Sequence, residues 1–292
     1  MANNYGQLEN GNQLEITSQY AYTTIRIECQ DENGIYSFGT GFFFSFFENE
    51  LENYAVISII TNRHVIEGFR KARFIFTISK PDGTPYDTDH YCLEIDNIQN
   101  RCLYHPDPRI DLCAIPFADF LKILKNKGIK PFFKTIDKSM IVCQDEKLSP
   151  LEEIIMVGYP NAIIDEINNQ PIIRKGMTAT NPNKNFNGKK EFLIDMACFP
   201  GSSGSPIFIY NNQCIINNMK FLGIVKATPL HKESFPVLDS SNNLTNYKSI
   251  IRIPNDLGIV IKAQELFGFE QPIAEIVINS GLNFKKGSIW HK

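Results

Sequence analysis

Short apolar segments recur along the chain and are separated by clusters of polar and turn-forming residues. The segments are rich in Ile, Phe and Tyr, which favour β-strands, and each has the length of a single strand. Turn-forming clusters such as Asp-Glu-Asn-Gly and Pro-Asp-Gly lie between them. Many short strands divided by turns predict an all-β barrel or sandwich. The predicted strands cover residues 22–29, 42–47, 54–61, 73–79, 112–116, 153–157, 192–195, 206–210, 221–225 and 258–261.

Helical periodicity is confined to residues 117–127 and 262–267. The region 117–150 is rich in lysine and has little strand pattern, so we interpret it as a linker between two β-rich parts of similar size. The predicted units are an N-terminal β-domain at 1–118, a linker at 119–150, a C-terminal β-domain at 151–265 and an extension at 266–292.

Composition and charge narrow the function classes. Hydrophobic residues make up 43% of the 292 residues and charged residues 21%, as in folded globular proteins. The net charge of −3 gives no basic excess for a nucleic acid or an anionic membrane surface. No apolar run approaches the ~18 residues of a membrane span. Residues 1–25 contain neither Lys nor Arg and no long apolar stretch, so no signal peptide is expected there.

The cysteine content indicates the compartment. The chain has 7 cysteines, an odd number with no Cys-x-x-Cys pair, which supports neither a disulfide framework nor a zinc site. Cys113 and Cys214 lie in apolar runs, where cysteine serves as a small core residue. We therefore expect a protein of the reducing cytoplasm.

Two local patterns supply a histidine and an aspartate. Residues 59–65, Ile-Ile-Thr-Asn-Arg-His-Val, form an apolar strand that ends near His64. Residues 109–115, Arg-Ile-Asp-Leu-Cys-Ala-Ile, place Asp111 at the start of an apolar strand, where aspartate is unfavourable. Taken alone, such a histidine is usually a surface or hydrogen-bonded core residue, and such an aspartate is commonly a turn cap. The functional alternative is a buried carboxylate that accepts a hydrogen bond from an imidazole.

A third pattern, Phe-Pro-Gly-Ser-Ser-Gly-Ser-Pro at 199–206, precedes a predicted strand. This many small residues can form an ordinary turn, but a nucleophile loop requires the same features. Gly201 can adopt a backbone conformation closed to other residues, which would point its N–H inward beside that of Ser203. Two such N–H groups would form an oxyanion hole, and losing one donor typically lowers the rate ~10²–10³-fold. Gly204 leaves space for the backbone of a substrate.

In combination, these motifs resemble those of the chymotrypsin-like (trypsin-like) serine peptidases. Gly-Ser-Ser-Gly-Ser-Pro is similar to their nucleophile motif, Thr-Asn-Arg-His-Val to the histidine motif of the bacterial branch, and Asp-Leu-Cys-Ala to the aspartate motif. The order His64, Asp111, Ser203 is that of the chymotrypsin class and not of subtilisin or the α/β-hydrolases. Gly-Thr-Gly at 39–41 is a lesser similarity, and the resemblance covers about residues 20–265.

The resemblance implies an all-β fold of two six-stranded antiparallel β-barrels, a short helical linker and a C-terminal helix or tail. It assigns Ser203 as the nucleophile, His64 as the general base and acid, and Asp111 as the group that orients the imidazole. The N–H groups of Gly201 and Ser203 would form the oxyanion hole. The implied protein is a cytoplasmic serine endopeptidase that cleaves a polypeptide substrate without cofactor or metal.

Two departures from secreted members of the family bear on regulation. Those enzymes carry an aspartate directly before the serine, where a newly cleaved N-terminus binds it, but this chain has Ser202 there. The cysteine that follows their histidine is Val65 here. We therefore expect a selective intracellular protease that acts on a partner protein, with activity controlled by a protein partner or by an unformed loop.

The same resemblance places a substrate pocket beside the serine. No aspartate marks the base of this pocket, so cleavage after Arg or Lys is not expected. Lys226 could attract an acidic side chain, but a solvated lysine is the simpler interpretation. The backbone of residues 225–228 is expected to pair with the substrate as an added β-strand. The predicted substrate-binding residues are Ala197, Cys198, Phe199, Lys226, Ala227 and Thr228.

Metal sites have little support. His105 with Asp107, and His90 with Asp89, lack a third ligand at suitable spacing. The lysines of residues 122–134 are interpreted as a solvated helix face rather than a nucleic-acid patch. We expect no metal, no cofactor and no nucleic-acid partner.

Two other functions are compatible with parts of the sequence. An α/β-hydrolase triad of Ser203, Asp256 and His291 would have the right order, but the chain lacks the strand–helix alternation and the nucleophile elbow of that fold. A catalytically silent, protease-like binding module is the second alternative, because a fold does not by itself establish activity.

Overall fold

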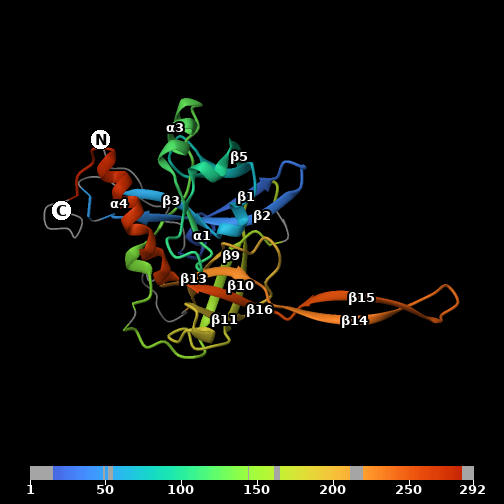
Figure 1. Ribbon diagram of the computed structural model, residues 1–292. Coiled ribbons are helices and arrows are strands. Elements are labelled where there is room, and N and C mark those ends of the chain that lie inside the picture. The colour runs from blue at the N-terminus through green and yellow to red at the C-terminus, as the bar shows by residue number, and fades with distance from the viewer. Residues whose placement is uncertain are drawn as a thin grey trace.

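The computed structural model describes residues 16–48, 50–51, 55–143, 145–160, 165–210 and 220–284. Figure 1 shows two β-rich halves packed on each other and a long hairpin that projects from the C-terminal half. The predominantly β structure and the C-terminal helix agree with the prediction from sequence. The helices are α1 (Ile16–Ala21), α2 (Arg63–Ile66), α3 (Ala118–Asn126) and α4 (Glu270–Asn279), and the 3-10 turns are η1 (Ile98–Arg101), η2 (Lys138–Met140), η4 (Phe186–Gly188) and η5 (Ala263–Phe269).

The N-terminal half is an eight-stranded sheet that does not close within the described residues. Its main path runs β5-β4-β1-β2-β3-β7-β6, and β8 pairs in parallel with β2. The prediction of a closed six-stranded barrel is therefore wrong for this half. After β5 the chain turns through η1 into β6, which has only 2 residues and offers too short an edge to close the sheet. The strands are β1 (Thr24–Gln30), β2 (Tyr36–Phe46), β3 (Val56–Thr61), β4 (Lys71–Ser79), β5 (Pro85–Asp96), β6 (Leu103–Tyr104), β7 (Cys113–Pro116) and β8 (Ile136–Asp137).

The C-terminal half contains the closed six-stranded barrel that was predicted. Its strands follow the order β10-β11-β16-β13-β12-β9 around the barrel, and each neighbouring pair is antiparallel. Apolar side chains such as Met156, Phe192, Ile207 and Val260 form its core. The strands are β9 (Glu153–Gly158), β10 (Ile172–Thr178), β11 (Glu191–Asp195), β12 (Pro206–Ile209), β13 (Lys220–Ala227) and β16 (Leu257–Lys262).

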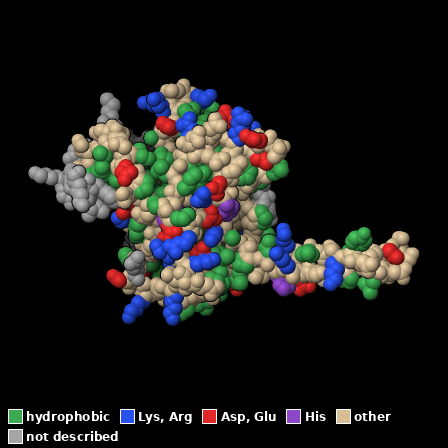
Figure 2. Space-filling view, in the orientation of Figure 1, with side chains coloured by type: hydrophobic (Ala, Val, Ile, Leu, Met, Phe, Trp, Pro, Cys, Tyr) green, Lys and Arg blue, Asp and Glu red, His purple; other side chains and the backbone are tan. Residues whose placement is uncertain are grey.

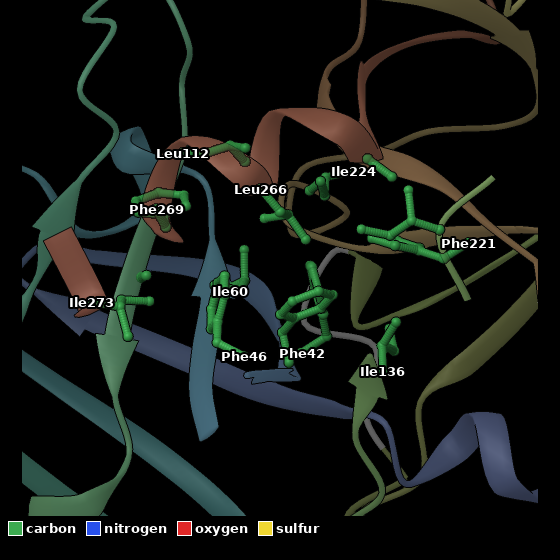
Figure 3. Close-up of a cluster of buried hydrophobic side chains, with 14 of the residues drawn as sticks. Phe42, Phe46, Ile60, Leu112, Ile136, Phe221, Ile224, Leu266, Phe269 and Ile273 are labelled. Atoms are coloured by element: carbon green, nitrogen blue, oxygen red, sulfur yellow. The ribbon is translucent and has the colours of Figure 1, made fainter. Parts of the chain in front are cut away.

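A shared hydrophobic core joins the two halves (Figure 3). The rings of Phe42 on β2 and Phe221 on β13 lie with centroids 5.3 Å apart. Leu266 and Phe269 from η5, together with Ile273 from α4, belong to the same buried cluster. Burial of each such side chain contributes about 1.5–3 kcal/mol. The residues that follow the barrel therefore help to fix the two halves against each other.

The region between the halves, from α3 to Ile141, packs against both of them. α3 covers most of the predicted helix at 117–127 and buries Phe120 and Leu124, whereas the second predicted helix, at 262–267, is a 3-10 turn. After α3 the chain returns to the N-terminal sheet through β8, and Ile141 then forms a parallel bridge with Phe221 of the barrel. The segment predicted as a linker is thus packed against both halves.

A two-stranded hairpin, called the arm below, lies between β13 and β16 in the sequence. It consists of β14 (Leu230–Leu238) and β15 (Leu244–Pro254), which pair only with each other. Figure 1 shows that it projects away from the barrel, and almost all of its residues are exposed.

Candidate functional site

His64 and Asp111 meet because the strands that carry them are neighbours. β3 ends at Thr61 and is followed by the single-turn helix α2, which holds His64. Asp111 lies just before β7, and the antiparallel pairing of β3 with β7 sets Thr61 opposite Cys113. The end of one strand and the start of the other therefore share one edge of the sheet, and both polar residues lie there.

Both carboxylate oxygens of Asp111 contact His64. Nδ1 of His64 lies 2.6 Å from Oδ2 of Asp111, while the backbone N–H of His64 donates to Oδ1 at 3.0 Å. Asn62 holds the same segment through a 2.9 Å hydrogen bond from its side-chain amide to the Asp111 carbonyl. An ionised carboxylate only accepts hydrogen bonds, so the proton lies on Nδ1 and Nε2 of the neutral ring is an acceptor. The half-exposed His64 ring can therefore receive a proton at Nε2.

The three serines of the loop between β11 and β12 differ in exposure. Ser202 and Ser205 are buried, with 1% and 0% of their surfaces exposed, whereas Ser203 is partly exposed. The Ser202 hydroxyl accepts a 3.3 Å hydrogen bond from the Phe199 N–H. The Ser203 hydroxyl donates to the Lys226 carbonyl oxygen at 3.3 Å. Of the three, Ser203 is the hydroxyl that a ligand can reach.

Two backbone N–H groups beside Ser203 are available to a ligand. The Ser202 N–H donates to the Phe199 carbonyl at 3.0 Å, and Gly201 has φ +89°, as at the third position of a type II turn. This backbone conformation strongly favours glycine. Neither the Gly201 N–H nor the Ser203 N–H donates to another described residue. Unpaired N–H groups at a buried loop are rare, and these two can donate hydrogen bonds to an anionic oxygen of a ligand.

Thr40, on β2, anchors this loop to the N-terminal half. Its N–H donates to the Ser203 carbonyl at 2.9 Å, and its hydroxyl donates to the Gly201 carbonyl at 3.0 Å. The same hydroxyl accepts from the Tyr159 N–H at 3.0 Å. The Thr40 side chain is fully buried, so these bonds fix the carbonyls of Gly201 and Ser203 in a site screened from water. Sequence reasoning missed this role, although a lone threonine among the apolar residues of β2 was its signal.

Thr61 connects the loop to the histidine segment. Its hydroxyl donates to the Thr40 carbonyl at 2.7 Å. Gly204 packs so closely here that a Cβ at this position would overlap the Thr40 carbonyl and approach the Thr61 hydroxyl. The loop that carries Ser203 and the segment that carries His64 therefore meet at the buried contact of Gly204 with Thr40 and Thr61. No hydrogen bond joins them directly, because the Ser203 hydroxyl is turned toward the Lys226 carbonyl.

The first three predicted pocket residues lie on the segment that enters the loop. The Ala197 carbonyl accepts a hydrogen bond from the Arg174 guanidinium, which also lies over the Phe199 ring at 5.0 Å from its centroid. Cys198 is buried, and burial raises the pKa of its thiol to about 11. This thiol is therefore protonated near neutral pH and is no competing nucleophile. Arg174, on β10, was not among the predicted residues.

The other three, Lys226, Ala227 and Thr228, follow the end of the β12–β13 pairing and are partly exposed. The interpretation of Lys226 as a solvated lysine is wrong. Its ammonium donates to the buried Glu191 carboxylate at 2.7 Å. Its charge is thereby neutralised, which leaves the backbone of this segment as the feature a ligand can use.

The remaining candidates from sequence have other roles or lie outside the described residues. The Asp107 N–H donates to Nδ1 of His105 at 3.1 Å, so Nε2 carries the proton and donates to the Glu265 carbonyl at 3.0 Å. His105 is thus a hydrogen-bonded core residue. His291 of the hydrolase alternative and Cys214 are not among the described residues.

The described part of the chain shows neither a cluster of side chains suited to a metal ion nor a helix that could span a membrane. These residues contain no group of three His, Cys, Asp or Glu side chains arranged to hold a metal ion. Their helices are all too short or too polar to span a bilayer.

One known protein family matches this chain in sequence. The profile of the family described as "Trypsin-like peptidase domain" matches residues 39–215, more than half of the chain. No curated protein matches the sequence significantly.

Among solved structures, an HtrA-type protease, AlgW, with a tripeptide has 14% identity and a TM-score of 0.44, over 91% of this chain and 63% of that one. The chain thus spans less than two thirds of the length of that protease. A thermostable serine protease, AL20, from an extremophilic microorganism has 10% identity and a TM-score of 0.48, over 86% and 97% of the two chains. A catalytically inactive tobacco etch virus protease with substrate has 12% identity and a TM-score of 0.47, over 96% and 93%. Because these TM-scores lie below 0.5, the family assignment rests on the sequence match.

Proposed function

The chain belongs to the trypsin-like peptidase family, and we propose that it is a serine endopeptidase in which Ser203, His64 and Asp111 form the catalytic triad. The observation that carries the proposal is the two-point contact of Asp111 with His64 at the strand edge beside the Ser203 loop. It leaves Nε2 as the acceptor that a serine nucleophile requires.

The proposed reaction begins when the Ser203 hydroxyl rotates from the Lys226 carbonyl toward Nε2 of His64. Oγ attacks the peptide carbonyl carbon while Nε2 takes its proton, and the Gly201 and Ser203 N–H groups bind the resulting oxyanion. The C–N bond then breaks as His64 returns the proton to the leaving amine, which leaves an acyl-enzyme. Water, deprotonated by His64, attacks the ester, and the product acid leaves as Ser203 regains its proton.

The loop geometry also bears on regulation. Ser202 occupies the position of the aspartate that secreted relatives use in activation, and its hydroxyl holds the turn at Phe199. Thr40 supplies further anchoring from the other half of the molecule. The proposal therefore includes a loop that forms without a new N-terminus. It also includes a selective cytoplasmic protease that acts on a partner protein and whose activity a protein partner regulates.

A fluorophosphonate probe tests the nucleophile. Ser203 Oγ should displace fluoride from phosphorus, and mass spectrometry should place the phosphonyl group on Ser203. We expect labelling of the wild type, none of Ser203→Ala, and strongly slowed labelling of His64→Ala. Ser205→Ala is the matched control and should still be labelled at Ser203. Folded wild-type protein that takes no label would contradict the proposal and favour the silent binding module.

A further inference from the structure

The arm exposes apolar surface that nothing in the described chain covers. Phe235, Ile251 and Ile253 share one face of the hairpin by their register, and all three are more than 40% exposed. Figure 2 shows hydrophobic and basic side chains along the arm, away from the body of the molecule. An isolated two-stranded hairpin is at best marginally stable in water. A bound polypeptide would supply the missing packing.

The opposite face of the arm carries three cations beside the exposed side chains of Leu230 and Ile250. Lys232 lies directly across from Arg252, and Lys248 lies across from Pro236 on the same face. None of the three cations forms an ion pair with a described residue. Like charges directly opposite each other destabilise a hairpin. Their placement therefore favours a ligand with negative side chains.

The arm continues the edge that the proposed substrate would use. On one side β13 pairs with β16, and on the other its pairing with the β12 segment ends near Val225, so residues 226–228 have a free edge beside Ser203. β14 follows β13 after Thr228 and Pro229, and its partner β15 is followed by β16 after Asn255 and Asp256. The edge of β14 that pairs with β15 thus corresponds to the edge of β13 that pairs with β16. The free edge of β14 consequently extends the free edge of residues 226–228.

We propose that the arm binds the part of an extended polypeptide substrate that lies N-terminal to the scissile bond, and that its cationic face selects acidic side chains there. This inference rests on the proposed peptidase function. Both neighbours of β13 are antiparallel to it. A substrate strand added in the same sense runs toward its own N-terminus as it passes from Ser203 to the arm.

The dimensions of the arm specify the pattern to be recognised. β14 has 9 residues, and at ~3.4 Å per residue it spans roughly 30 Å of an extended chain. The cations lie at two levels, set by Lys232 with Arg252 and by Lys248 opposite Pro236. These levels are four β14 residues apart, or about 14 Å. Side chains i and i+4 of an extended substrate lie on one face of the strand at the same spacing. Acidic residues at every fourth position therefore fit best.

Binding to a repeating peptide tests the proposal without requiring catalysis. The full chain carrying Ser203→Ala is titrated into a fluorescein-labelled peptide of four Glu-Ser-Val-Ser repeats, and fluorescence anisotropy gives the Kd. The matched peptide has Gln in place of each Glu. We expect the Glu peptide to bind about tenfold more tightly, from several partly exposed charge pairs. K232S/K248S/R252S should remove this preference.

A second triple variant controls for net charge. K122S/K125S/K127S removes three exposed cations from α3 and the residue after it, on the other half of the molecule, and should keep the preference. Equal binding of the two peptides, or an equal loss in both triple variants, would overturn the proposal. Sedimentation velocity on the same proteins tests the other occupant. A dimer that only the arm variant converts to monomer would make the arm a self-association surface and also overturn it. Phosphonate labelling of the wild type reports the peptidase function separately.

Discussion

Asp111→Asn is expected to lower the rate of the proposed reaction by about 10⁴-fold, as a misassigned histidine tautomer does in this type of triad. The reason lies in the two hydrogen bonds from His64 to the carboxylate. The backbone N–H of His64 must meet an acceptor, so the amide oxygen of the substituted side chain would face it and the NH₂ group would face Nδ1. Nδ1 then becomes the acceptor and Nε2 carries the proton, so His64 can no longer accept the Ser203 proton.

The measurement is the second-order rate constant for phosphonate labelling, together with hydrolysis of a reduced, carboxymethylated protein. Asp107→Asn is the matched control, because its carboxylate lies in the same segment but pairs with Arg109 at 2.7 Å and does not touch His64. We expect this control to react at the wild-type rate. An Asp111→Asn protein within tenfold of the wild type would show that Asp111 does not set the tautomer.

Thr40→Val is expected to lower kcat about 10²-fold while KM changes little, an effect of the size seen when one oxyanion donor is lost. Valine has nearly the shape of threonine but cannot donate to the Gly201 carbonyl or accept from the Tyr159 N–H. The Gly201 carbonyl would then lose its side-chain anchor. Gly201 itself would be held less firmly, and with it the N–H group that is proposed to bind the oxyanion. The substrate edge at Lys226 is not touched by the change.

Thr40→Ser keeps the hydroxyl and is expected to keep most of kcat, which separates hydrogen bonding from packing. Both variants need a thermal unfolding curve, because Thr40→Val leaves two buried polar groups unpaired, and each should cost about 1–3 kcal/mol of stability. The relevant readout is kcat per folded molecule. If Thr40→Val lowers only the stability, or if Thr40→Ser loses as much activity, Thr40 does not position the oxyanion hole.

The apolar strands and their order along the chain could be predicted because each is encoded locally. β3 and β7 are both apolar runs in which most residues are buried. Polar residues follow β3 and precede β7, and His64 and Asp111 lie among them. Two other strands had no such signal. β5 is largely exposed, and along β10 partly buried residues alternate with exposed ones. Such strands are held by pairing with their neighbours, which a local pattern does not record.

The open N-terminal sheet could not be predicted for a related reason. Whether two edge strands meet depends on chain turns and strand lengths far apart in sequence, as the turn at η1 and the short β6 illustrate. The arm was missed because its residues face no core, so no hydrophobic periodicity is imposed on them, and Pro236 interrupts the pattern. Family resemblance supplied the candidate triad, but it did not indicate the partners of Lys226 or Thr40.

The central claim is that Ser203 carries out peptide-bond hydrolysis, and cleavage of a defined unfolded protein tests it most directly. Wild type and Ser203→Ala are incubated with reduced, carboxymethylated α-lactalbumin, and mass spectrometry records the new carboxyl termini. The account predicts new termini with the wild type and none above background with Ser203→Ala. Equal cleavage by both proteins, or no cleavage by a wild type that is folded, would contradict it.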